Sequence, residues 1–351
     1  LIVDDSMVFR AAINEALSAL PVVEVVGKVR NGQEAIDFLK DNEVDLMTLD
    51  MEMPVKDGIT TINEVREFNK KLIIICFSSH TRSGAEKTIE ALTSGANDFV
   101  PKPDGSNSSG VEAIRDQLLP KIKAFRERIS GASSATINST QVSAPKKQVI
   151  NTNLLSLSPK AICIGVSTGG PETLKTIFSD IPEGLKIPLF LVQHMPPMFT
   201  KQLANALDKV SGVTVVEAEH GMIAEPGVCY VAPGDYHMEI EDSGEGIKIS
   251  LNQAPKICYV RPAVDVLFKT ASEVYSDRLL GIVLTGMGQD GLQGARDIVS
   301  KGGEIAIQDE KSCVVWGMPA AIHNSDLEVT TYDLDKIAEL ITESAMKGGV
   351  L

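Results

Sequence analysis

The chain has 351 residues and a formal net charge of −14 at pH 7, with 33 basic and 47 acidic side chains. This length suits about two or three domains, each of which buries its own hydrophobic core. The acidic excess argues against nucleic acid or an anionic membrane as the main partner. No apolar run approaches the roughly 18 residues of a membrane span, and no signal peptide is visible, so we expect no insertion into a membrane.

The cysteines indicate a reducing compartment. They show no C-x-x-C spacing and mostly lie inside apolar runs, so we expect reduced core residues of a cytoplasmic protein, with neither a structural disulfide nor a zinc site. The chain also opens without methionine, inside a strand-like run, which predicts that a few N-terminal residues are missing. The cysteines are Cys76, Cys163, Cys229, Cys258 and Cys313.

In the first third of the chain, strand-like apolar runs alternate with segments whose apolar residues recur at helical spacing. This repeated βα pattern predicts a parallel, doubly wound α/β sheet. The strand-like runs are residues 1–3, 22–29, 44–49, 72–77 and 96–100, and the helical segments are residues 7–20, 33–40, 59–69 and 85–94.

Polar residues with matching chemistry follow several of these strand-like runs. Asp4 and Asp5 follow the first run and Asp50 the third, and ligands bind at the carboxyl ends of parallel strands. Three carboxylates brought together suit Mg²⁺, and crowding them without a cation is costly. Ser78 and Lys102 follow two further runs, where a hydroxyl and an ammonium can bind a phosphoryl group placed on a carboxylate. Taken singly, the two N-terminal aspartates also fit helix N-caps, and the lysine a solvated loop position.

This part of the chain, up to about Leu119, resembles the receiver domain of two-component response regulators. The resemblance implies a flavodoxin-like fold, a histidine kinase as phosphodonor, and Mg²⁺ as the cofactor of phosphorylation. The residues that it implies are Asp50 as phospho-acceptor, Asp4, Asp5, Asp50 and the backbone carbonyl of Glu52 for Mg²⁺, Ser78 and Lys102 for the phosphoryl group, and Phe99 as the aromatic switch residue.

A linker separates this domain from the next. Residues 111–129 predict a charged amphipathic helix. Residues 130–158 are rich in Ser, Thr, Asn and Gln and show little apolar periodicity, so they cannot bury a core. We therefore divide the chain into a first domain at residues 1–119, a helical extension and flexible linker at residues 120–158, and a second domain at residues 159–351.

The second domain begins with βα alternation and continues with shorter β-like segments, and we expect a Rossmann-like, three-layer α/β/α fold with a second doubly wound parallel sheet. The predicted strands are residues 161–166, 188–192, 213–217, 228–231, 237–240, 247–251 and 280–284, and the predicted helices are residues 172–178, 199–207 and 263–274 and one that begins at Leu292.

A glycine-rich turn follows the first of these strands, with the sequence Gly-Val-Ser-Thr-Gly-Gly at residues 165–170. A serine between small residues at a strand-to-helix turn is typical of a nucleophile elbow, which exposes the hydroxyl of Ser167 and offers the backbone N–H of Thr168 to an oxyanion. The alternative is a plain glycine-rich βα turn. The turn lacks the Lys-Ser/Thr ending of a P-loop and does not fit G-x-G-x-x-G, so nucleotide binding is a weaker interpretation.

Two further strand ends supply the partners of a serine nucleophile. His194 ends an apolar strand, and Asp290 lies in another strand-to-helix turn. Together with Ser167 they make a possible acyl-transfer triad of nucleophile, base and orienting carboxylate. Asp290 also fits a cap of the helix that follows Gly291. The other histidines that compete for the role of base are His220, His237 and His323.

The second domain resembles the catalytic domain of the bacterial chemotaxis protein-glutamate methylesterases. The resemblance implies hydrolysis of glutamate γ-methyl esters on chemoreceptor signalling helices, deamidation of certain receptor glutamines, and no cofactor in this domain. It also implies Ser167, His194 and Asp290 as the triad, with the backbone N–H of Met287 joining that of Thr168 at the oxyanion. The matching motifs are residues 165–170, 193–197, 232–235, 261–268, 284–291 and 313–319.

The domain order further predicts control of the enzyme. A receiver joined by a flexible segment to an esterase domain suggests autoinhibition until Asp50 is phosphorylated, in a monomer that binds no nucleic acid. Two other functions remain open. One is a phosphorylation-controlled binding module without hydrolytic activity, and the other is a transcriptional regulator, although the second domain is acidic and shows no helix-turn-helix pattern.

Overall fold

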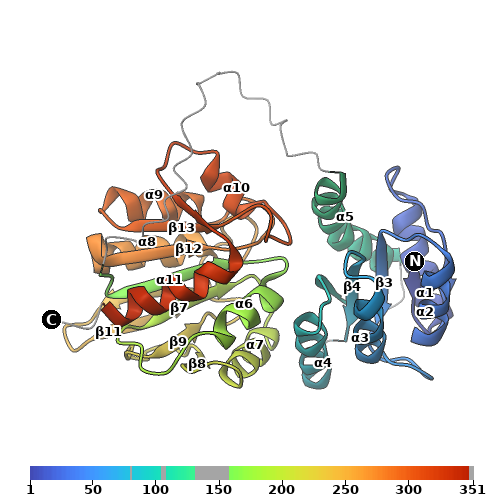
Figure 1. The fold of residues 1–351 in the computed structure, drawn as a ribbon, viewed down its shortest axis with the longest axis horizontal. Coiled ribbons are helices and arrows are strands. Elements are labelled where there is room, and N and C mark those ends of the chain that lie inside the picture. The colour runs from blue at the N-terminus through green and yellow to red at the C-terminus, as the bar shows by residue number, and fades with distance from the viewer. Residues whose placement is uncertain (80, 104–107, 131–157, 348–351) are drawn as a thin grey trace. The chain divides into compact units, whose positions relative to one another are not determined.

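The computed structural model describes residues 1–79, 81–103, 108–130 and 158–347, which belong to two compact units, Leu1–Arg126 and Glu127–Leu351 (Figure 1). The boundary falls within helix α5 (Ser108–Ser130), which covers the helix predicted at residues 111–129. Most of the predicted linker lies outside the described residues. None of the helices in the described ranges is long and apolar enough to cross a membrane.

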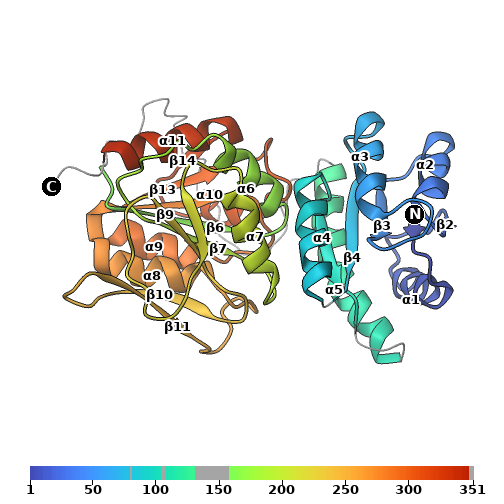
Figure 2. The same ribbon diagram turned by 90° about the horizontal axis from the view of Figure 1, so that it is seen from below.

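The first unit contains a five-stranded, fully parallel sheet. Its strands are β1 (Ile2–Val3), β2 (Lys28–Val29), β3 (Leu46–Asp50), β4 (Ile73–Ser78) and β5 (Asp98–Pro101), and its helices besides α5 are α1 (Met7–Ser18), α2 (Gly32–Asp41), α3 (Gly58–Phe68) and α4 (Arg82–Thr93). The strand order is β2-β1-β3-β4-β5, and helices cover both faces (Figure 2). This order is that of flavodoxin-like folds, so the predicted fold class is confirmed.

One predicted strand of this unit is much shorter than expected. Residues 22–29 were expected to form a strand, but only Lys28–Val29 do so, and Val22 and Val26 are exposed. The reason lies in the sheet edge, because β2 pairs only with β1, which itself has two residues. A run of valines favours a strand, but without a longer partner it has no backbone groups to pair with.

The second unit contains a seven-stranded, fully parallel sheet and an antiparallel hairpin. The sheet strands are β6 (Ala161–Val166), β7 (Leu189–Gln193), β8 (Thr214–Glu217), β9 (Val228–Val231), β12 (Leu279–Val283), β13 (Glu304–Gln308) and β14 (Thr330–Tyr332), and the hairpin strands are β10 (His237–Asp242) and β11 (Ile247–Asn252). The sheet order is β14-β13-β12-β6-β7-β9-β8. The chain winds outward from β6 in one direction and later from β12 in the other, which confirms the predicted doubly wound fold.

Helices cover both faces of this sheet. They are α6 (Gly170–Ser179), α7 (Phe199–Asp208), α8 (Val264–Tyr275), α9 (Leu292–Ser300), α10 (Met318–His323) and α11 (Leu334–Lys347), with a short 3₁₀ helix at Ser276–Arg278. Helices α6, α7 and α11 pack on one face, and α8 and α9 with the hairpin on the other (Figures 1 and 2). Alternate strand residues such as Cys163, Phe190 and Ile305 join Phe268 of α8 in the core of the second face. The two strands from which the chain winds in opposite directions, β6 and β12, are neighbours, and a crevice at their carboxyl ends is where such folds bind ligands.

Four elements of this unit were not assigned from the sequence. Strand β14 and helix α10 are short, and short segments give a weak periodic signal, but β13 is as long as the predicted strands β7 and β12 and its apolar residues are buried. Helix α11 shows a clear periodic signal, because its buried residues Ile337, Leu340 and Ile341 recur at helical spacing. The apolar period alone therefore predicts α11.

Candidate active site and phosphorylation site

Ser167 lies in a tight turn between a buried strand and a helix. It directly follows β6, and α6 begins at Gly170. Gly169 has a φ of 80°, a left-handed conformation that glycine adopts without steric cost. The Ser167 N–H donates to the carbonyl oxygen of Thr285 at 3.0 Å, which ties the turn to the loop after β12. The turn therefore has the strand–turn–helix form of a nucleophile elbow.

His194 lies beside Ser167 because their strands pair. Val166 of β6 and Gln193 of β7 are register partners, and each is the last residue of its strand. The His194 N–H donates to the Val166 carbonyl oxygen at 3.1 Å, which continues the ladder by one residue. Ser167 and His194 are thus the next residues on two adjacent parallel strands. The imidazole is largely buried, and its Nε2 lies 2.8 Å from Oδ2 of Asp290.

Four donors surround the carboxylate of Asp290. Its Oδ2 contacts His194 Nε2 and accepts the N–H of Val264 at 2.6 Å, and its Oδ1 accepts the N–H groups of Asp265 and Gly291, both at 3.0 Å. Because an ionised carboxylate only accepts, Nε2 of the histidine carries the proton, which leaves Nδ1 as the basic nitrogen. Asp290 was expected as a cap of the helix after Gly291, but Gly291 itself is the N-cap of α9, without a side-chain cap. Asp290 instead accepts N–H groups at the N-terminus of α8, and its contact with the imidazole fits the orienting role that remains a prediction.

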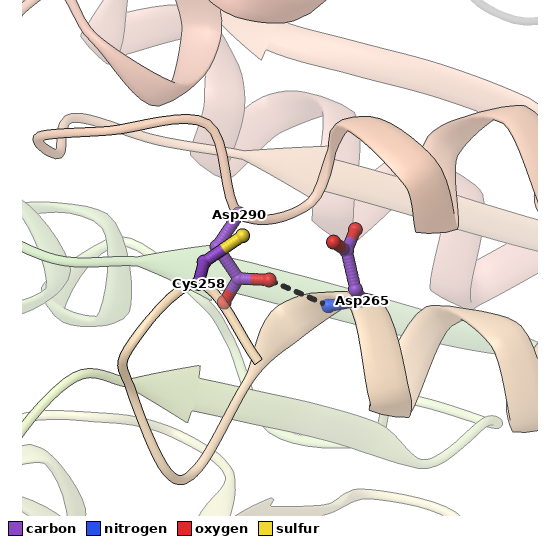
Figure 3. A group of neighbouring side chains, drawn as sticks. All are labelled: Cys258, Asp265 and Asp290. Carbon is purple, nitrogen blue, oxygen red and sulfur yellow. Dashed lines mark hydrogen bonds between the residues drawn. The ribbon is translucent and has the colours of Figure 1, made fainter. Parts of the chain in front are cut away.

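A second aspartate, Asp265, stands next to Asp290 (Figure 3). Its Oδ1 accepts the N–H groups of Gly291 and Gly294 at 2.9 Å and 2.7 Å, at the N-terminus of α9. Burial, together with the charge of Asp290, raises the pKa of Asp265 to about 6, although the backbone donors act against this. For Asp290 burial acts in the same direction, but the contact with His194 and the backbone donors outweigh it and lower the pKa. Asp290 is therefore the one that stays ionised beside the imidazole.

Cys258 is the third side chain in Figure 3, with its sulfur within 4.8 Å of both carboxylates. It was expected in the core, but it is exposed, whereas the other four cysteines are buried; all five are free thiols. Cys258 and Tyr259 have φ values of 49° and 66°, which turn the chain outward between two bridged residues. Burial and the charges of Asp290 and Asp265 raise the pKa of the thiol. The group does not fit a metal ion, because both oxygens of Asp290 already accept two hydrogen bonds each.

The three competing histidines have other contacts. His220 is exposed, and its Nδ1 accepts the N–H of Leu251. His237 is buried, and its Nε2 contacts the carbonyl oxygen of Pro255. His323 lies against the ring of Trp316. These contacts are structural, so His194 remains the candidate base.

The predicted oxyanion residues flank the serine. Thr168 follows it in the elbow, and Met287 follows Gly286, which lies directly against it. A Cβ atom on Gly286 would lie 2.8 Å from Ser167 Cβ and 2.5 Å from Met318 Sδ, so only glycine fits there. The N–H of Met318 donates to the Gly286 carbonyl oxygen at 2.8 Å, which fixes the loop that carries Met287.

Sequence reasoning missed two side chains that hold this arrangement. Gln193 donates from Nε2 to the Ser167 carbonyl oxygen at 2.9 Å, and Thr285 donates from Oγ1 to the Thr168 carbonyl oxygen at 2.9 Å. Both are buried. Their only sequence signal is a polar residue at the end of an apolar strand, which does not reveal what the side chain binds.

In the first unit, three predicted residues meet at the carboxyl ends of β1, β3 and β5. Nζ of Lys102 lies 2.8 Å from Asp50 Oδ1 and 3.3 Å from Asp4 Oδ2, and both carboxylates are buried. Burial, together with the charge of Asp50, raises the pKa of Asp4 to about 6, although Lys102 acts against this. Burial alone would lower the pKa of Lys102, but the two carboxylates outweigh it and raise that pKa. The alternative of a solvated loop lysine is therefore wrong, and Ser6, not an aspartate, is the N-cap of α1.

Most of the remaining predicted residues of this site line a pocket in the first unit. Asp5, Glu52 and Ser78 line it together with Asp50 and Lys102. Oγ of Ser78 contacts Thr88 Oγ1 at 2.5 Å, Glu52 Oε1 pairs with Lys87, and the ring of Phe99 is buried. The carboxylate oxygens of Asp4, Asp5 and Asp50 lie within 4.8 Å of one another. Crowded oxygen donors of this kind fit Mg²⁺.

Comparisons with known proteins agree with this geometry. The family model described as CheB methylesterase matches residues 162–341, which are just over half of the chain. The chain belongs to this family. The model of the response regulator receiver domain matches residues 1–114. The chain therefore joins a receiver domain to a CheB methylesterase domain.

Curated relatives match this chain over most of their length. The protein-glutamate methylesterase/protein-glutamine glutaminase of Trichodesmium erythraeum is 41% identical over 343 residues, which are 97% of each chain. The protein of the same name from Pyrococcus abyssi is 38% identical over 354 positions, with 99% of this chain and 94% of the relative covered. The crystal structure of the Thermotoga maritima CheB methylesterase catalytic domain is 40% identical, with a TM-score of 0.52, and covers 53% of this chain and 99% of that one.

Proposed function

We propose that this chain hydrolyses glutamate γ-methyl esters on chemoreceptor signalling helices and deamidates specific receptor glutamines. The observation that carries the proposal is the contact of His194 with the buried carboxylate of Asp290, beside Ser167, at the point where the sheet reverses its winding. The names of the relatives supply the substrate class.

In the first half of the reaction, Oγ of Ser167 attacks the ester carbonyl carbon while Nδ1 of His194 takes its proton. Asp290 holds the imidazole in the tautomer with hydrogen on Nε2 and stabilises the imidazolium that forms. The backbone N–H groups of Thr168 and Met287 receive the charge that develops on the carbonyl oxygen. The C–O bond to the methoxy group then breaks, and the Nδ1 proton leaves with methanol.

In the second half, a water molecule attacks the acyl-enzyme. His194 takes one proton from the water and returns it to Oγ of Ser167, which releases the glutamate carboxylate. A receptor glutamine follows the same course, except that ammonia leaves in the first half. A serine with one base and two oxyanion donors suffices for these steps, and we assign no cofactor to this domain.

Phosphorylation of Asp50 in the receiver domain is the proposed control. The receiver domain implies a kinase as phosphodonor, and we propose that it is a chemotaxis histidine kinase. Asp4, Asp5, Asp50 and the backbone carbonyl of Glu52 would hold Mg²⁺, which when bound neutralises the crowded carboxylates and an oxygen of the phosphoryl group. Lys102, already paired with Asp50, and the hydroxyl of Ser78 lie at the same pocket to contact the phosphoryl oxygens, and Phe99 would respond to their movement.

The test is methanol release from methylated receptor membranes by the full-length protein. Ser167→Ala should abolish it, because a methyl group fits the same turn but cannot form the acyl-enzyme. Surface substitution Asp326→Asn, whose carboxylate is 76% exposed, is the control and should leave the rate unchanged. Methanol release by the Ser167→Ala protein at a rate near that of the parent would contradict the proposed nucleophile, and its absence from a folded parent would favour a binding module instead.

A further inference from the structure

The peptide group between Ser167 and Thr168 is fixed by hydrogen bonds to its carbonyl oxygen. Its carbonyl oxygen, that of Ser167, accepts the N–H of Gly170 at 2.9 Å and Nε2 of Gln193 at 2.9 Å. A trans peptide is planar, so its C=O and N–H point in opposite directions. Whatever fixes the Ser167 carbonyl therefore also fixes the direction of the Thr168 N–H.

The next peptide group is held by another side chain. Oγ1 of Thr285 donates to the Thr168 carbonyl oxygen at 2.9 Å and accepts the N–H of Val315 at 2.9 Å. The backbone N–H of Thr285 itself donates to Oε1 of Gln308 at 2.8 Å, and Thr285 is fully buried. The carbonyl groups on both sides of Thr168 are thus fixed by side chains from β7 and from the loop after β12.

The placement of Gln193 is one that packing alone does not favour. Its Nε2 faces two carbonyl oxygens, those of Ser167 and His194, so the amide cannot be turned over. Its Oε1 is buried and has no hydrogen-bond partner among the described residues. A Cβ atom on Gly170 would lie 1.8 Å from this oxygen, so glycine at that position makes room for the amide. Leaving a buried acceptor unpaired costs free energy. We attribute the retention of this amide to its Nε2 group, which donates to the Ser167 carbonyl oxygen.

We propose that Gln193 and Thr285 are positioning residues of the oxyanion site, which aim the Thr168 N–H at the substrate by holding the carbonyl groups on either side of it. This inference rests on the proposed esterase function and deepens it. Both side chains are buried and act through the backbone that they hold. Their contribution lies in preorganisation, because a donor that is already aimed at the developing charge needs no reorganisation during the reaction.

The experiment compares full-length variants by kcat and KM for methanol release from receptor membranes, by the pH profile of kcat, and by thermal unfolding. Gln193→Met keeps the length of the side chain but removes the donor, and Thr285→Val removes only the hydroxyl. Each should lower kcat by about tenfold to a hundredfold, with KM changed less than about twofold, because the lost interaction acts in the transition state. Thr285→Ser keeps the hydroxyl and should recover most of the loss. The acidic limb of the pH profile should not move, since the base is untouched.

Two further variants separate positioning from general damage. Gly170→Ala leaves Gln193 chemically intact but occupies the space of its amide, and it should also lower kcat. Ile305→Val removes one methylene group from the core near the amino end of β13, away from the strand ends that carry the site, and should lower the unfolding temperature without lowering kcat.

A second readout keeps this inference separate from the proposed substrate. A fluorophosphonate reacts with Oγ of Ser167, which forms an O–P bond while fluoride leaves, and the product places an oxygen at the oxyanion site. Slower labelling of Gln193→Met and Thr285→Val than of the parent would support positioning even if no receptor ester were cleaved, a result that would overturn the proposed function alone. Labelling rates and kcat values within twofold of the parent, or losses equal to those of Ile305→Val, would overturn the inference.

Discussion

At the scale of one residue, the hydrogen bonds of Asp290 explain why this position needs a carboxylate. Among the described residues, its four hydrogen-bond partners are all donors: the ring Nε2 of His194 and the backbone N–H groups of Val264, Asp265 and Gly291. A group with two accepting oxygens satisfies them all. An amide cannot, because its NH₂ would face a donor whichever way it is turned.

We therefore expect Asp290→Asn to lower both the activity and the stability of the protein. It should lower kcat by about 10³-fold or more, because the histidine loses its fixed tautomer and its charge partner. It should also destabilise the second unit by about 1–3 kcal/mol, because one buried donor is left without an acceptor. Methanol release and thermal unfolding measure the two effects, with Asp326→Asn as the surface control. A variant that unfolds like the parent and keeps a tenth of its rate would contradict this account of the site.

At the scale of elements, helices α8 and α9 are joined by exchanged caps. Asp290, just before α9, accepts N–H groups at the N-terminus of α8, and Asp265, in α8, accepts N–H groups at the N-terminus of α9. The positive ends of two helix dipoles thus face two carboxylates. This arrangement fixes Asp290 at the active site, but it also crowds two like charges.

The pH dependence of stability follows from that crowding. The pKa of Asp265 is about 6 in the folded chain, above the ordinary 3.8, so between these pH values the folded state holds more protons than the unfolded state. The contribution of Asp265 to stability therefore falls as pH rises from about 4 to about 6 and is level above. Asp265→Asn retains an oxygen for Gly291 and Gly294 but lacks the charge. We expect it to be about 1–2 kcal/mol more stable than the parent at pH 7.5, after allowance for the lost dipole attraction, and no more stable at pH 4.

Unfolding by urea at both pH values, followed for the second unit, measures this difference. Asp326→Asn, which also removes one carboxylate, should show no such change with pH, because its side chain is 76% exposed. An advantage of Asp265→Asn that is larger at pH 4 than at pH 7.5 would mean that the sign of the pKa shift is wrong.

At the scale of the whole molecule, the chain uses one architectural rule twice. In each unit the proposed reactive side chain lies at the carboxyl end of a parallel strand, with Asp50 as the last residue of β3 in the first unit and Ser167 directly after β6 in the second. The chain connects the two units, and the autoinhibition that we propose would couple their sites. A tethered inhibitor needs only weak affinity, because a linker of this length holds its effective concentration at roughly millimolar or below.

We expect a chain that starts near residue 156 to be more active in methanol release than the unphosphorylated full-length protein. A small-molecule phosphodonor with Mg²⁺ should raise full-length activity, and chelation of Mg²⁺ or Asp50→Ala should remove that stimulation, because the added charge draws Lys102 and Ser78 toward the phosphoryl group and alters the receiver surface. The decisive comparison is among the full-length, truncated and Asp50→Ala proteins, each with and without phosphodonor. Equal rates for the full-length and truncated proteins, together with stimulation of the Asp50→Ala protein by the phosphodonor, would rule out autoinhibition through this receiver.

The sequence by itself determined the fold class and named the residues to which we assign the reaction. Parallel strands place their carboxyl ends on one edge, so the order of apolar runs was enough to predict that Asp4, Asp50 and Lys102 meet, and that Ser167 and His194 are neighbours. It failed where a local pattern depends on a partner, as in the two-residue β2 and the exposed Cys258. Only the tertiary structure decided that Nε2 of His194 faces Asp290, that Asp265 shares the helix termini, and that Gln193 and Thr285 hold the elbow. These contacts join side chains and backbone groups far apart in the chain, and their geometry is set by packing, for which a linear pattern carries no signal.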